Sequence, residues 1–99
     1  MAHRYQVMLT REHPYANLPK AVRHLNTTLH WSRRYYQNRY ENEATLTVTG
    51  YAGGDEFKDQ IRFFSTYYKH IFFHVTTYGE NGVDETVTYL NGEPVLEQR

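Results

Sequence analysis

The sequence contains no cysteine, which excludes disulfides, thiolate nucleophiles and zinc sites built on cysteine. No apolar run approaches the ~20 residues of a membrane-spanning helix, and the first residues show no signal-peptide pattern. We therefore expect a cytoplasmic protein. A chain of 99 residues supports one hydrophobic core, which predicts a single domain over residues 1–99.

Residue constellations for catalysis or metal binding are also missing. His70 and His74 are four apart in a segment with strand character, where that spacing separates them by ~13 Å. His24 and His30 are six apart on an expected helix and point in different directions. Neither of the two serines has the glycine pattern of a nucleophile elbow. We expect no metal, no cofactor and no enzymatic activity.

Tyrosine is abundant instead. The chain has ten Tyr, five Phe and one Trp, which makes 16% of its residues aromatic. Every buried phenol hydroxyl needs a hydrogen-bond partner, so several tyrosines are expected at the surface. Tyr, Trp and Arg are enriched at binding hot spots, whereas the alternative is that Tyr fills strands, where aromatic residues are favoured.

The charged residues are unevenly distributed along the chain. Residues 1–40 hold seven basic residues and one acid, a net charge of +6, whereas residues 41–99 hold four basic residues and ten acids, a net charge of −6. Two opposite half-faces would favour an oriented contact, including head-to-tail self-association. Alternatively, the two halves interleave in the fold and their charges cancel locally.

The first half of the chain predicts a strand, a helix and an ambiguous segment. Residues 4–10 alternate as in a half-buried strand, and Pro14 marks the loop over 12–17. A helix opens at Leu18-Pro19. Its apolar stripe is Leu18, Val22, Leu25 and Leu29.

Residues 31–40 are compatible with two interpretations. Tyr36 and Tyr40 could extend the stripe of the first helix. Alternatively, residues 34–40 form an aromatic strand that turns at 41–43 and pairs with a strand over 44–51. We favour the strand because asparagine and paired tyrosines form helices poorly.

A second helix and three strands are expected in the second half. Asp55 caps the helix, whose stripe is Phe57, Ile61, Phe64 and Tyr68, and Lys69-His70 closes it with positive charge. Strands follow over 71–78, 83–90 and 93–97, separated by turns at Asn81-Gly82 and Asn91-Gly92.

This order, β-α-β-β-α-β with a C-terminal β-hairpin extension, predicts an α+β fold of the ferredoxin-like split βαβ type. Its antiparallel sheet would carry both helices on one face and leave the other face open. If residues 18–40 formed one helix, the fold would still be α+β.

Two other classes of binding protein fit parts of the sequence. RNA-recognition domains share this fold, and Arg23, Arg33, Arg34 and Arg39 with Trp31, Tyr35 and Tyr36 could form a basic-aromatic patch for single-stranded nucleic acid. Zero net charge and the acidic C-terminal hairpin argue against it. A small-ligand-binding domain would use the open sheet face, with Phe72 and His74 exposed there.

The C-terminal segments FFHVTTYGENG at 72–82 and TYLNGEPV at 88–95 resemble the end of small ferredoxin-like domains of unknown function carried by phages and plasmids. The two segments together make up 19 of the 99 residues of the chain. Those domains often carry a conspicuous Trp near their start, which this sequence lacks. The resemblance implies a mobile-element accessory protein that binds a host protein, for example as an inhibitor of a defence system.

The sequence therefore predicts a small non-enzymatic binding protein that acts through protein–protein contact and can form a homodimer. Single-stranded nucleic acid and a small ligand are the alternatives, and no membrane partner is expected. The residues predicted to bind the partner are Trp31, Arg34, Tyr35, Tyr36 and Arg39, with Glu80, Asp84 and Glu85 as a second, acidic surface.

Overall fold

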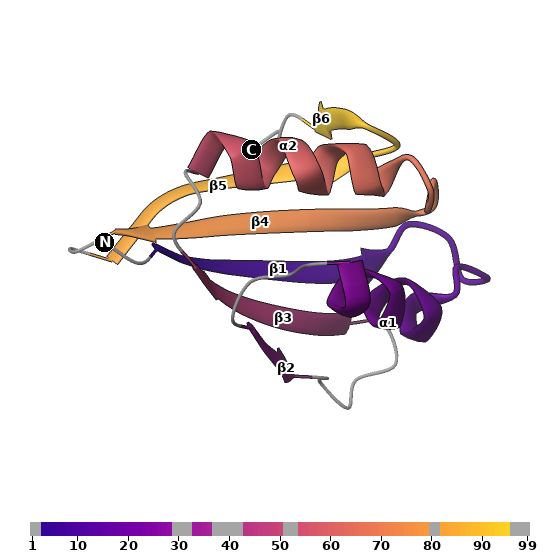
Figure 1. The fold of residues 1–99 in the computed structure, drawn as a ribbon. Helices are drawn as coiled ribbons and strands as arrows, with labels where there is room; N and C mark the ends of the chain where they lie inside the picture. The colour runs from indigo at the N-terminus through magenta and orange to yellow at the C-terminus, as the bar shows by residue number, and fades with distance from the viewer. Residues whose placement is uncertain (1–2, 29–32, 37–42, 51–53, 80–81, 96–99) are drawn as a thin grey trace.

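The computed structural model of the chain describes residues 3–28, 33–36, 43–50, 54–79 and 82–95. These residues form two helices and six strands (Figure 1). In chain order they are β1 His3–Arg11, α1 Leu18–Thr28, β2 Arg33–Tyr36, β3 Glu43–Gly50, α2 Gly54–Ser65, β4 Ile71–Gly79, β5 Gly82–Leu90 and β6 Glu93–Val95.

The six strands form one sheet in the order β2-β3-β1-β4-β5-β6, and every neighbouring pair is antiparallel. Strand β1 is central, with Val7 opposite Leu46 of β3 on one side and Val75 of β4 on the other. Strands β5 and β6 extend the sheet beyond β4. The expected α+β class is confirmed, and the arrangement is compatible with a ferredoxin-like fold.

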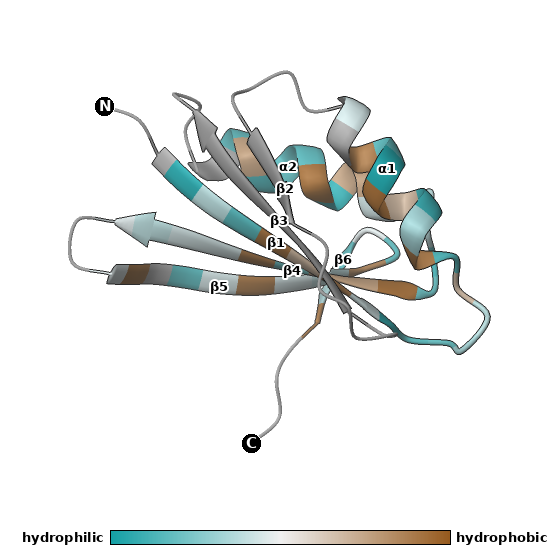
Figure 2. Cartoon of the chain, turned by 90° about the horizontal axis from the view of Figure 1, so that it is seen from below, coloured by the Kyte–Doolittle hydropathy of each residue, from teal (hydrophilic) through white to brown (hydrophobic). Residues whose placement is uncertain are grey.

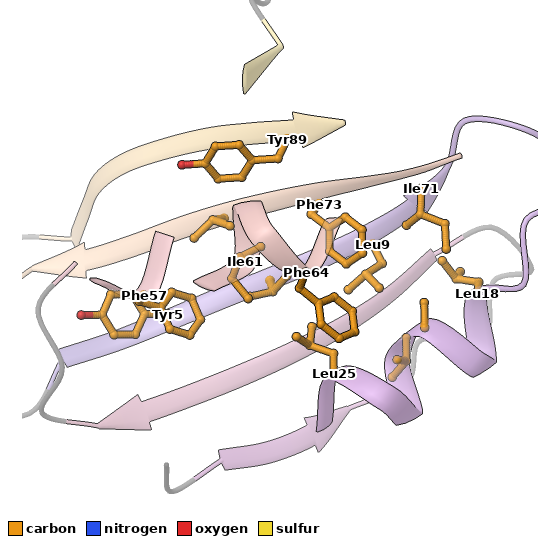
Figure 3. Packing of buried hydrophobic residues seen from close by; sticks show 14 residues of the cluster. Tyr5, Leu9, Leu18, Leu25, Phe57, Ile61, Phe64, Ile71, Phe73 and Tyr89 are labelled. Atoms are coloured by element: carbon orange, nitrogen blue, oxygen red, sulfur yellow. The ribbon is translucent and has the colours of Figure 1, made fainter. Parts of the chain in front are cut away.

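Both helices lie on the same face of the sheet, as Figure 2 shows from below. The core fills the space between these two layers. Alternate residues of the two central strands face it: Tyr5, Val7 and Leu9 of β1 and Ile71, Phe73 and Val75 of β4 are all buried. In Figure 3, Phe57 of α2 stacks on Tyr5 with ring centroids 4.2 Å apart.

Helix α1 begins where the sequence predicts, at Leu18. The Asn17 side chain caps it by accepting a 3.1 Å hydrogen bond from the Lys20 N–H. Pro19 lies in the first turn, where its missing N–H costs nothing. The helix buries Leu18, Ala21, Val22 and Leu25 against the sheet.

The backbone answers two questions about the middle of the chain: whether a helix or a strand follows α1, and where the next strand begins. Arg33–Tyr36 is a strand, so the helix that would run through residues 18–40 is wrong, and the strand expected over 34–40 is confirmed for residues 34–36 and begins one residue earlier. Residues 37–40 lie outside the described residues. Glu43 belongs to β3 and pairs with Thr10, although the sequence placed it in the preceding turn.

Helix α2 ends at Ser65, which corrects the expected end at Lys69-His70. The backbone N–H groups of residues 66–68 bond to the carbonyls three residues back, at 3.0–3.2 Å. The Ser65 and Thr66 hydroxyls donate to the carbonyls of Arg62 and Phe63, at 2.6 and 2.7 Å. Since these hydroxyls compete for the helical acceptors, the last turn tightens and the helix stops.

The end of α2 also holds the turn between β5 and β6. The buried Ser65 hydroxyl accepts a 2.9 Å hydrogen bond from the Gly92 N–H, and Arg62 Nε donates a 2.6 Å bond to the Gly92 carbonyl. Asn91 and Gly92 both have positive φ, 50° and 80°, as the two central residues of a type I′ hairpin do. The predicted Asn91-Gly92 turn is therefore confirmed and is anchored to the helix.

We expect Ser65→Ala to lower the free energy of unfolding by about 1–2 kcal/mol, because the part-buried Gly92 N–H would lose its acceptor. Urea denaturation followed by circular dichroism measures the loss. Thr66→Ala is the matched control, since its hydroxyl makes the same backward bond at an exposed position. Equal losses for the two variants would show that the bond to Gly92 contributes nothing.

Candidate interaction surfaces

The basic-aromatic residues predicted to bind a partner fall at one edge of the sheet. Arg34, Tyr35 and Tyr36 make up most of β2, the outermost strand on that side, and pair with residues of β3. Trp31 and Arg39 lie outside the described residues. The backbone thus brings three of the five predicted residues together on an edge strand.

The predicted acidic residues lie elsewhere in the sheet. Asp84 and Glu85 belong to β5, and Glu80 lies outside the described residues. Four strand spacings separate β5 from β2, about 19 Å. Glu85 is exposed and accepts a 2.7 Å hydrogen bond from Lys58 Nζ. The two predicted surfaces are therefore separate, and part of the acidic one is already neutralised.

The helical layer carries an exposed aromatic cluster that the sequence prediction missed. Phe63 of α2 and Tyr67, which follows that helix, are 65% and 61% exposed. Their rings meet edge to face with centroids 5.6 Å apart. His24 of α1 lies 6.3 Å from the Tyr67 ring and 4.8 Å from the Phe64 ring. We call His24, Phe63, Tyr67 and Tyr68 the aromatic surface.

A hydrogen bond between the two helical segments fixes the aromatic surface. His24 Nδ1 and the Tyr68 hydroxyl are 2.9 Å apart, although 44 residues separate them in sequence. The Tyr68 ring stacks on Phe64, which in turn packs against Phe73 of β4. Burial raises the pKa of Tyr68, so its hydroxyl keeps its proton at neutral pH. The exposed rings thus stand on a framework anchored to the core.

Three exposed cations border the aromatic surface. Lys20 and Arg23 lie within the turn of α1 that precedes His24, and Lys69 follows Tyr68. Among the described residues, these three side chains form no ion pair or hydrogen bond.

The described ion pairs leave the positive charge of this surface in place. Lys58 pairs with Glu85, and Arg62 lies 3.7 Å from Glu93, so these bases of the second half meet acids of the same half. Among the described residues, no acid of the second half pairs with Lys20 or Arg23.

The open face of the sheet carries a network of polar side chains. His74 is central: Nε2 lies 2.9 Å from the Thr10 hydroxyl and Nδ1 lies 2.8 Å from the Thr88 hydroxyl. The Tyr78 hydroxyl donates a 2.8 Å bond to Gln6, and the Arg4 guanidinium lies 4.3 Å from the Tyr78 ring centroid.

This network bears on the alternative of a ligand on the open face. Phe72 and His74 do lie there, half-buried, with ring centroids 5.9 Å apart. Thr88, also on this face, is only 6% exposed. The polar groups of the open face bond mainly to one another. They are therefore less available to a ligand than the exposed rings of the aromatic surface.

In the described ranges, no group of three His, Asp or Glu residues is placed to hold a metal ion. In the same ranges, neither helix has the length and apolarity that spanning a bilayer requires. Comparison with protein-family models, curated proteins and solved structures finds no match.

A sequence signal for the aromatic surface existed. Phe63 and Tyr67 are four residues apart, which places them on one side of a helix, yet they fall outside the stripe of Phe57, Ile61 and Phe64. A second aromatic pair out of phase with the buried stripe predicts exposed rings.

Proposed function

We propose that the protein is a small non-enzymatic binding protein that acts through protein–protein contact, using the aromatic surface. The observation that carries the proposal is the exposed pair Phe63 and Tyr67, 65% and 61% accessible and packed against each other. Covering a ring of this size on a partner is worth about 1.5–3 kcal/mol. Aromatic residues presented on a rigid base are typical of interface hot spots.

We propose further that the fold is ferredoxin-like. The support is the order β2-β3-β1-β4, antiparallel throughout, with a helix between β1 and β2 and another between β3 and β4. Strands β5 and β6 then form the C-terminal hairpin extension. In this arrangement the helical layer and the open sheet face are independent surfaces, so a partner on one leaves the other free.

A role as a phage or plasmid accessory protein that inhibits a host system, in the cytoplasm, is part of this proposal. Its support is the resemblance of the C-terminal hairpin segments. The identity of the partner decides the matter, because a component of a host defence system is what such a protein would bind.

We expect the double variant Phe63→Ala, Tyr67→Ala to weaken binding of the native partner at least tenfold, about 1.4 kcal/mol, with the fold retained. Both rings are largely exposed, so their removal changes stability little. The measurement is quantitative affinity capture from cells in which the protein occurs, with mass spectrometry of bound material and circular dichroism of each variant.

Val83→Ala is the matched control for that experiment, because Val83 is equally exposed, at 62%, but lies on β5. It should capture the partner as the wild type does. A partner that binds the double variant undiminished would contradict the aromatic surface. Nucleic acid released by salt would support the alternative of a single-stranded nucleic-acid module.

A further inference from the structure

The charge around the aromatic surface indicates the chemistry of its partner. Lys20, Arg23 and Lys69 supply three exposed positive charges that no described acid neutralises. The first turn of α1 contains no acid either. The nearest acid within α2, Asp59, lies four residues before Phe63, about 6 Å along the helix at 1.5 Å per residue, so three cations outnumber one nearby carboxylate at this surface.

We propose that the aromatic surface binds an acidic protein segment that carries at least one apolar side chain. This inference rests on the proposed function and specifies its partner. The apolar side chain would cover the edge-to-face pair of Phe63 and Tyr67, while the carboxylates would meet Lys20 and Arg23. Complementary charge at the rim of an apolar centre speeds association and selects against basic competitors.

A second copy of this chain is a poorer occupant. Of its described acids, Glu12 pairs with His70 at 2.9 Å, Glu85 with Lys58, and Glu93 lies near Arg62. To offer these carboxylates to another molecule, the chain would have to break its own ion pairs. Among the described acid side chains, that leaves Glu56 and Asp59 outside any ion pair for the aromatic surface of another copy.

Single-stranded nucleic acid also fits less well. Bases bind by stacking on open ring faces. Tyr67 is surrounded by the rings of Phe63, Phe64 and His24, and its planes make angles of 81°, 63° and 54° with them. Rings tilted against one another at such angles offer no shared flat plane on which successive bases could stack, whereas an aliphatic side chain needs no such plane.

The test is a titration of the full-length protein, followed by the chemical shifts of its backbone amides. The probe is a short synthetic peptide of Glu, Asp, Leu and Ser. Two further probes are the same peptide with Lys at every acidic position and single-stranded oligothymidylate. We compare the wild type with K20A/R23A and with the charge-matched control V83E/T86E, which also lowers the net charge by two but on β5.

We expect the acidic peptide to shift the amides of residues 20–24 and 63–69. Its dissociation constant should rise about tenfold in K20A/R23A and stay unchanged in V83E/T86E. At ~0.3 M NaCl, where charges more than several ångströms apart are screened, wild-type binding should approach that of K20A/R23A.

Three results would overturn the inference. The first is equal binding of the lysine peptide at the same amides, which would leave the aromatic surface as a protein-docking site without charge preference. The second is that the same amides shift with oligothymidylate but not with the acidic peptide, or that they shift when the protein concentration alone is raised. The third is no shift with the acidic peptide at low salt; the proposed function would then be judged by the capture experiment, which uses the native partner.

Discussion

Phe73→Ala is expected to lower the free energy of unfolding by about 3–5 kcal/mol, the usual cost of removing a buried Phe side chain. Phe73 is fully buried on the central strand β4, where its ring meets Phe64 of α2 at 5.8 Å. It thus lies between the sheet and the framework that carries the aromatic surface (Figure 3). A domain of this size is stable by about 5–15 kcal/mol, so the variant should lose a large fraction of its stability.

The neighbouring residue provides the control for this prediction. Phe72 is on the open face of β4 and is only half-buried, so Phe72→Ala should cost clearly less than Phe73→Ala. Urea titrations of both variants, followed by tryptophan fluorescence and circular dichroism, give the two values. Equal costs would contradict the two-layer arrangement and would mean that the open face is packed as tightly as the core.

Gly92→Ala should have the second largest effect on stability, about 2–3 kcal/mol. An L-residue in the left-handed region costs about 1–2 kcal/mol, and Gly92 has a φ of 80°. In addition, a Cβ there would lie 2.8 Å from Thr66 Cγ2. Thr66 can rotate away only by giving up its hydrogen bond to the Phe63 carbonyl.

A double-mutant cycle separates these two costs. Thr66→Ser removes Cγ2 but keeps the hydroxyl, so Gly92→Ala should cost about 1 kcal/mol less in the Thr66→Ser background, leaving the φ strain alone. Thermal or urea unfolding of the four proteins measures the difference. An identical cost in both backgrounds would mean that the turn moves away from α2 and that its contact with the helix end is loose.

Much of the fold could be predicted because local patterns and the tertiary structure agree. The alternation of Tyr5, Val7 and Leu9 predicts one buried strand face, and the Asn91-Gly92 pair predicts its turn through the need for positive φ. The end of α2 could not be predicted from the aromatic stripe. It depends on the hydroxyls of Ser65 and Thr66, whose competition for helix carbonyls the periodicity does not register.

The candidate site was harder to predict than the fold. The excess of Tyr and Arg predicted exposed aromatic residues, as Tyr15 and Tyr67 are, and the binding residues that the sequence placed at 31–39 stay a prediction. Exposure of Phe63 and Tyr67 depends on which helical face meets the sheet, and the bond from His24 to Tyr68 joins segments far apart in the chain. Contacts between distant segments cannot be recognised in the local sequence. The four-residue spacing of Phe63 and Tyr67, in contrast, is a local pattern that predicts exposed rings.

We propose that a protein partner covers the aromatic surface. Photo-crosslinking from a benzophenone side chain at position 67, in cells where the protein occurs, tests it most directly, with the same group at position 83 as the control. We predict one dominant crosslinked protein from position 67, absent from position 83 and displaced when the wild-type chain is co-expressed in excess. Crosslinks of equal yield from both positions, or none from position 67, would contradict the account.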